Sequence, residues 1–256
     1  MTTDLPVPAS PSPVPDRRVP GTVARILGPI LIVVASFLFS GIVYGFAKAF
    51  GLSDDSAVAI AGFCGSAAIL GFGLLLRSRY PAHERRLMTG PRWSLPAALG
   101  IGLALGIGMR LVIGIMVTIG QAVDPGLCEE LVKLDDDLIP PALWHKLLLA
   151  LSLVVLAPLG EELVFRAILL RGLARKLPFA TSALISGVLF GLAHQGYWTL
   201  WPLLVGICVF GVVAAYVYRR MGFAANVAMH ATFNLVVAIF LFVDVGLGDQ
   251  QPSDCT

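Results

Sequence analysis

The chain has little charge. Only 13% of its 256 residues are Asp, Glu, Lys or Arg, while 57% are hydrophobic and the mean hydropathy is +0.85. Soluble domains carry about 25% charged residues, so a soluble globular domain is excluded. The formal net charge is only +2, and the basic residues lie in loops between apolar runs rather than along one helix face. Nucleic-acid binding is therefore not expected.

Cysteines are also scarce in the chain, and residues that promote order are scarce near its N-terminus. The four cysteines form no Cys-x-x-Cys pair, so a zinc–thiolate centre is not expected. The first twenty residues hold six prolines and few large apolar side chains, which predicts a disordered cytoplasmic tail over residues 1–22. No cleavable signal peptide is predicted, because the first apolar run starts near Ile26 and is too long.

Apolar runs long enough to cross a membrane, about 20 residues each, recur along the chain. They lie at residues 26–50, 57–76, 95–121, 145–170, 179–197, 200–218 and 223–243. These runs predict an all-α, polytopic transmembrane helical bundle of seven helices, or eight if Pro158 divides the long fourth run. We divide the chain into four parts: the tail at 1–22, three N-terminal transmembrane helices and loops at 23–144, a helical core with the polar motifs at 145–245, and a short C-terminal tail at 246–256.

The loops between these runs differ in charge. Basic clusters lie before the first run and after the second, fourth and sixth, whereas acidic residues dominate the loops in between. The positive-inside rule then predicts a multi-pass protein with a cytoplasmic N-terminus and, with seven helices, an outer C-terminus. Close helix contacts are indicated by three Gly-x-x-x-Gly pairs, which are Gly41/Gly45, Gly102/Gly106 and Gly187/Gly191.

Three short segments place ionisable or amide side chains in runs that should be buried in lipid. They are Glu161 to Arg166, Phe190 to His194 and His230 to Asn234. Such groups are costly at membrane depth and mark a functional site by default. Glu162 and Arg166 are i, i+4 neighbours that should pair, while Glu161 is turned about 100° away along the helix. We therefore interpret Glu161 as the reactive carboxylate and the Glu162–Arg166 pair as its support.

The three segments are predicted to meet. If Leu177-Pro178 is the turn between two antiparallel helices, Glu161 and His194 are each 16 residues from it. In two antiparallel helices, residues at the same number of positions from the turn lie at the same depth, here about 24 Å from the turn. His230 and Asn234 lie one helical turn apart on the last helix at an overlapping depth, so one buried cluster can hold all three segments.

A carboxylate and two imidazoles in a partly dry pocket suit proton transfer and water activation. Glu161 and His194 would deprotonate a water, and His230 and Asn234 would donate hydrogen bonds to a tetrahedral oxyanion. Alternatively, Glu161, His194 and His230 would ligate zinc and leave a fourth position for water. The residue types leave both possibilities open, so the expected cofactor is either zinc or none.

Two further features stand outside these segments. Arg110 lies in the middle of the third run without an assigned partner, and it would either pair with a buried carboxylate such as Glu162 or extend toward a membrane face. Tyr197 and the neighbouring tryptophans are typical of an aromatic belt at the membrane interface.

At the three polar segments the sequence resembles the CPBP family of intramembrane endopeptidases, which contains the CAAX prenyl proteases and the bacteriocin-processing and self-immunity (Abi) proteins. The motifs of that family are E-E-x-x-x-R, F-x-x-x-H and H-x-x-x-N. All three occur here in order, as Glu161, Glu162 and Arg166, then Phe190 and His194, then His230 and Asn234. The resemblance covers residues 145–245, and the first 140 residues carry no motif of the family.

The resemblance implies a helical intramembrane hydrolase with a cavity open to the cytoplasm. It implies that Glu161 and His194 activate water and that His230 and Asn234 stabilise the oxyanion, with metal use disputed within the family. We therefore predict an intramembrane endopeptidase, of metallo or metal-independent glutamate type, that acts on membrane-associated or lipidated proteins or peptides. The alternative is a non-catalytic scaffold or bacteriocin self-immunity protein in which the same cluster only ties helices together. A proton-coupled transporter would show inverted repeats and broken helices, which the sequence lacks.

Overall fold

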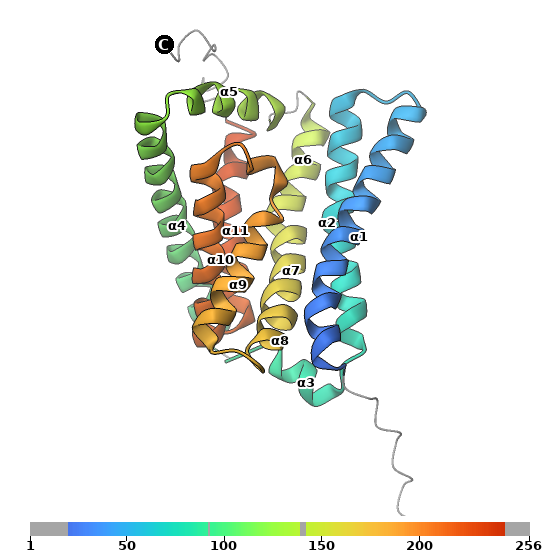
Figure 1. Cartoon of the computed structure of the whole chain (residues 1–256). Helices are drawn as coiled ribbons and strands as arrows, with labels where there is room; N and C mark the ends of the chain where they lie inside the picture. Colours follow the sequence, from blue (N-terminus) through green and yellow to red (C-terminus); the bar gives the residue numbers. More distant parts are fainter. Residues whose placement is uncertain (1–19, 92, 139–141, 244–256) are drawn as a thin grey trace, which may run out of the picture.

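The long helices of the computed structural model follow the apolar runs of the sequence (Figure 1). The structure describes residues 20–91, 93–138 and 142–243, which contain no strand. Within them six helices are long and apolar enough to cross a membrane: α1 (Thr22–Ala49), α2 (Asp54–Ser78), α4 (Leu95–Val123), the helical run Leu143–Leu173, α10 (Trp201–Met221) and α11 (Phe223–Phe240). The predicted polytopic all-α fold is confirmed, and the predicted terminal tails fall almost entirely outside the described residues.

The run Leu143–Leu173 stays one helix through Pro158. It consists of α6 (Leu143–Leu151), the π-helical segment η1 (Ser152–Leu156), α7 (Ala157–Glu161), the π-helical segment η2 (Glu162–Leu170) and α8 (Arg171–Leu173). A proline removes one helical N–H donor and usually kinks the helix. Here the turn before Pro158 widens instead, so the alternative of an eighth helix at this position is wrong.

The helix that follows is shorter than predicted. Helix α9 (Phe179–Leu192) has 14 residues, or about 21 Å of length, which is less than the ~30 Å of a hydrocarbon core. The predicted run 179–197 therefore extends too far. The helix ends because His194 leaves helical geometry, and the 3-10 turn η3 (Gln195–Tyr197) follows before α10 begins.

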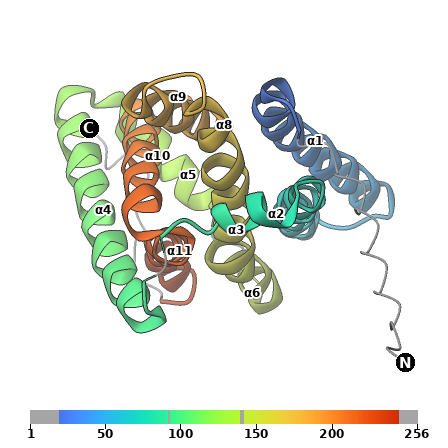
Figure 2. The ribbon, with the colours of Figure 1, turned by 90° about the horizontal axis from the view of Figure 1, so that it is seen from below.

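The run Leu143–Leu173 lies between two groups of helices. Helices α1 and α2 pack together and contact it from one side, while α9, α10 and α11 contact it from the other, and α4 packs outside them against α10 and α11 (Figure 2). The short helices α3 (Ala82–Leu87) and α5 (Gly126–Leu138) lie across opposite ends of the bundle (Figure 1). The run that carries Glu161 is therefore shielded on both sides.

Two of the three predicted glycine pairs lie at close helix contacts. A Cβ atom at Gly102 or Gly106 of α4 would overlap α11, and one at Gly187 or Gly191 of α9 would overlap α10. The third pair, in α1, meets no atom within 4 Å in the described structure. The glycines thus bring α4 close to α11, which carries the third polar segment, and bring α9, which carries the second, close to α10.

Helix α3 is joined to the bundle by a buried carboxylate. Glu84 is 3.3 Å from Arg25 Nη1 on α1 and 2.6 Å from Arg175 Nη2, which follows α8. Burial acts to raise the pKa of the Glu84 carboxyl, but the hydrogen bonds from the two arginines outweigh it and hold that pKa below its usual value. This ion cluster connects the α1–α2 pair to the central helix at one end of the bundle.

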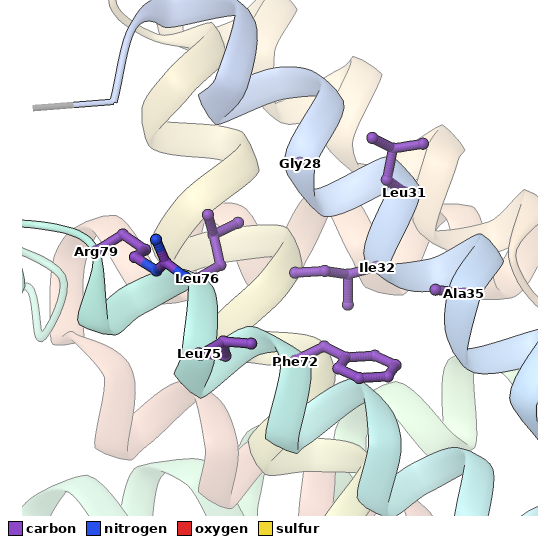
Figure 3. A pocket seen from close by; sticks show the side chains of 8 residues that line it. All are labelled: Gly28, Leu31, Ile32, Ala35, Phe72, Leu75, Leu76 and Arg79. Carbon is purple, nitrogen blue, oxygen red and sulfur yellow. The ribbon is translucent and has the colours of Figure 1, made fainter.

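A groove with a volume of about 430 Å³ lies between α1 and α2 (Figure 3). The side chains along it are apolar except for one guanidinium at the end of α2. It is lined by Gly28, Leu31, Ile32, Ala35, Phe72, Leu75, Leu76 and Arg79. No residue of the three polar segments reaches this groove, so it is separate from the site described below.

Candidate active site

The three polar segments meet at one carboxylate oxygen. Glu161 is the last residue of α7, His194 follows the end of α9, and His230 lies on α11. Glu161 Oε2 is 3.9 Å from His194 Nε2 and 3.8 Å from His230 Nε2. The Glu161 side chain is 18% exposed, and its Oε2 atom has no hydrogen-bond partner within the described part of the chain. A partly buried acceptor thus faces two imidazoles.

The orientation of the His194 ring is set by its own helix. His194 Nδ1 is 2.8 Å from the carbonyl oxygen of Phe190, one of the carbonyls that the end of α9 leaves without a helical donor. A carbonyl only accepts, so Nδ1 carries the hydrogen and donates it. In the neutral ring, Nε2 then presents its lone pair toward Glu161.

Glu162 is fully buried and organises the other side of the site. Its Oε1 atom is 2.8 Å from His230 Nδ1, and its Oε2 atom is 3.2 Å from Arg166 Nε and accepts a hydrogen bond from Asn226 Nδ2. The predicted Glu162–Arg166 pair is present. Because an ionised carboxylate only accepts, His230 donates through Nδ1 and turns Nε2 toward Glu161.

Arg166 and Phe190 fill the space behind these groups. The Arg166 guanidinium is fully buried, donates from Nη2 to the carbonyl oxygen of Gly211 at 3.3 Å and lies 4.2 Å from the centroid of the Phe190 ring. The same ring is 4.8 Å from the His194 ring and 5.7 Å from the His230 ring, centroid to centroid. Phe190 therefore separates the buried cation from both imidazoles and packs against each.

Asn234 is held by a carbonyl that Pro158 leaves free. In η1 the N–H of Ala157 bonds to Ser152 O, five residues earlier, so the next carbonyl, that of Leu153, would pair with residue 158. Proline has no N–H. Asn234 Nδ2 supplies the missing donor at 2.8 Å from Leu153 O, and its second amide hydrogen remains for another partner.

Two residues at the site were missed in the sequence. Asn226, a fully buried ligand of Glu162, lies four residues before His230, and this i, i+4 spacing was the available signal. Tyr197 was expected in an interfacial belt, and its contact with the site was not predicted. Its partly buried ring stacks on His194 with the centroids 6.2 Å apart and the planes at 8°, because α9 ends early and η3 returns to the site.

The three candidate zinc ligands lie further apart than the ligands of a bound tetrahedral zinc. Two ligands of a tetrahedral zinc, bound at about 2.0–2.2 Å, lie about 3.4 Å apart. The distances from Glu161 Oε2 to the two Nε2 atoms are wider, at 3.8 and 3.9 Å. Among the described residues no group of three His, Cys, Asp or Glu side chains could hold a metal ion. The chemistry below is therefore derived from protein groups alone.

Residues 143–236 match the protein-family model Type II CAAX prenyl endopeptidase Rce1-like. This segment is therefore similar to the Rce1-like family. The match starts with α6, ends within α11 and includes all seven motif residues, which confirms the resemblance drawn from them. Together with the six long apolar helices of the described residues, the match supports an integral membrane protein. No curated protein and no solved structure was found to match the chain.

Proposed function

We propose that the protein is an intramembrane endopeptidase that hydrolyses peptide bonds in membrane-associated or lipidated proteins or peptides. The observation that carries the proposal is the unsatisfied Glu161 Oε2 atom between the Nε2 atoms of His194 and His230. Gaps of 3.8 and 3.9 Å are too long for direct hydrogen bonds and suit a bridging water. The similarity of residues 143–236 to a family of CAAX endopeptidases supports peptide hydrolysis.

In the proposed reaction Glu161 is the general base. It takes a proton from a water that also donates to His194 Nε2, and the water oxygen forms a bond to the scissile carbonyl carbon. The resulting oxyanion accepts hydrogen bonds from Asn234 and from His230. Glu161 then returns the proton to the amide nitrogen as the carbon–nitrogen bond breaks.

The position of His230 supports its role as a donor. Its Nε2 atom is 3.8 Å from Glu161 Oε2 and faces the reacting space. When the ring is protonated, it carries a hydrogen on this atom as well as on Nδ1. Asn234, one turn further along α11, is anchored at Leu153 with an amide hydrogen to spare.

The non-catalytic scaffold or self-immunity protein is the weaker alternative. A cluster that only ties helices together would have its buried polar atoms satisfied by one another. Glu162 is bonded to three side chains, but Glu161 Oε2, Arg166 Nη1 and Asn226 Oδ1 have no partner in the described structure. Of these three residues only Glu161 is partly exposed, and its free oxygen faces two imidazoles.

The test is turnover by purified protein in liposomes, with a lipidated or membrane-proximal peptide as substrate. Glu161→Gln and His194→Ala should each lower kcat by about 10²–10⁴-fold, the usual contribution of a general base, while the proteins stay folded. Glu129→Gln, which makes the same change at an exposed site on α5, should keep wild-type turnover. Wild-type rates in Glu161→Gln and His194→Ala would refute the mechanism.

A further inference from the structure

Arg110 is an intramembrane cation whose counter-charge is missing from the described chain. It lies 15 residues after the first residue of α4, about 22 Å along a helix. No carboxylate of the described residues lies within 4.0 Å of its guanidinium. Glu162, the partner considered from the sequence, is taken up by Arg166, Asn226 and His230. Uncompensated cations are costly at this depth.

The guanidinium faces the catalytic helices rather than lipid. Gly102, Gly106 and Arg110 recur every four residues along α4, and both glycines lie against α11. One turn further, the Arg110 guanidinium is 5.3 Å from the centroid of the Phe233 ring on α11. Phe233 directly precedes Asn234, so Arg110 lies beside the part of α11 that carries the proposed oxyanion donors.

Tyr197 lies between Arg110 and the site. Its ring stacks on the His194 imidazole, and its hydroxyl interacts electrostatically with both the Arg110 guanidinium and the Glu161 carboxylate. A hydroxyl donor therefore lies beside the groups that would hold the water, and the Arg110 cation interacts with that hydroxyl. Nothing in the mechanism above uses either of them.

We propose that Arg110, with the Tyr197 hydroxyl, forms a subsite that binds a carboxylate of the substrate next to the scissile bond. The inference rests on the proposed peptidase function. A guanidinium binds a carboxylate through two parallel hydrogen bonds, and a peptide supplies this group only as its C-terminus or as an Asp or Glu side chain. When no substrate occupies the subsite, the Phe233 ring provides a cation–π contact that offsets only part of the cost of the buried charge. Arg110 also lies outside the segment that matches the family, residues 143–236.

The experiment compares three lipidated peptides of one sequence in liposomes. One ends in a free carboxylate, one in a C-terminal amide, and one in Glu followed by a C-terminal amide. Each is cleaved by wild type, by Arg110→Gln and by Arg79→Gln, the last a control that removes the same charge from an exposed position in the groove between α1 and α2.

Wild type should prefer a carboxylate-bearing peptide over the plain amide by about 10- to 100-fold in kcat/KM, the range for a charge-assisted hydrogen-bond pair. In Arg110→Gln the ratio of kcat/KM for the carboxylate-bearing peptide to that for the plain amide should fall to about one, and Arg79→Gln should keep the wild-type ratio. If the preference for the free-acid peptide depends on Arg110, the subsite binds the C-terminal carboxylate. If the preference for the Glu peptide depends on Arg110, the subsite binds a carboxylate side chain. Tyr197→Phe should reduce the preference by a few-fold.

Two results would refute the subsite and leave the peptidase proposal intact. One is equal cleavage of all three peptides by wild type. The other is an equal loss of activity on all three peptides in Arg110→Gln. No cleavage of any peptide by wild type would refute the proposed function and this inference with it. If Arg110→Gln does not fold, Arg110→Lys replaces it: the charge remains but the paired hydrogen bonds are lost, so the preference should shrink without vanishing.

Discussion

Glu161 and Glu162 are neighbours in sequence, yet the same isosteric change should affect them in opposite ways. Glu162 is fully buried and bonded to Arg166, Asn226 and His230. Glu162→Gln leaves the guanidinium of Arg166 as an uncompensated charge with no access to water. Breaking a buried ion pair by removing one partner costs about 3–5 kcal/mol. By contrast, Glu161 forms no ion pair with an arginine in the described structure, so Glu161→Gln should change the free energy of unfolding by less than about 1 kcal/mol.

Thermal unfolding in one detergent and turnover of one lipidated peptide would be measured on both variants. A loss of 3–5 kcal/mol corresponds to a decrease in Tm of about 6–20 °C in a chain of this size, which is expected for Glu162→Gln. Glu161→Gln should keep the wild-type Tm and lose turnover. The double variant Glu162→Gln with Arg166→Met should recover part of the lost Tm, because it also removes the unpaired charge.

Equal decreases in Tm in the two single variants would refute this division of roles, because Glu161 would then be as firmly bonded as Glu162. A Glu162→Gln protein with wild-type Tm would show that the buried ion pair is not formed. Either result would also remove the explanation for the orientation of His230.

Three further outcomes are expected. Pro158→Ala restores an N–H that competes for the Leu153 carbonyl, so kcat should fall about tenfold through the displaced Asn234 while Tm does not fall; an unchanged kcat would contradict this anchoring. Because the pKa of Glu84 is held below its usual value, its stabilising contribution is present at neutral pH and is lost as the pH falls below about 4. Glu84→Gln should therefore lower Tm at pH 7 and flatten its decline in acid, and a parallel decline would refute the assignment. A strong chelator should leave turnover unchanged, and elemental analysis should find less than one zinc per chain. Turnover that is lost with chelator, together with one zinc per chain, would show that Glu161, His194 and His230 move closer together to bind the metal.

The parts of the fold and site that could be predicted follow from rules that act along one helix. Lipid requires apolar runs of a fixed length, so most helix boundaries were predicted to within a few residues. Counting residues from the turn at Leu177-Pro178 placed Glu161 and His194 at equal depth, and their side chains do meet. The i, i+4 rule paired Glu162 with Arg166.

The parts that could not be predicted depend on hydrogen bonds between helices. The end of α9 at Leu192 brings Tyr197 back to the site, although the apolar character of the sequence continues past that residue. In both π-helical segments a side chain of a neighbouring helix donates to a backbone carbonyl: Asn234 on α11 to Leu153 O in η1, and Ser186 on α9 to Phe165 O in η2. The surroundings of Arg110 likewise become visible only once α4, η3 and α11 are placed together.

The two π-helical turns make the length of the central helix as important as its composition. Each such turn holds one residue more than an α-helical turn, and η2 begins at Glu162, directly after the proposed base. Deleting a single residue from this turn would let the helix relax to ordinary pitch. Everything beyond the deletion would rotate by about 100° relative to Glu161, so the Arg166 guanidinium would turn away from Gly211 on α10 and Phe190 on α9 even though every motif residue was still present.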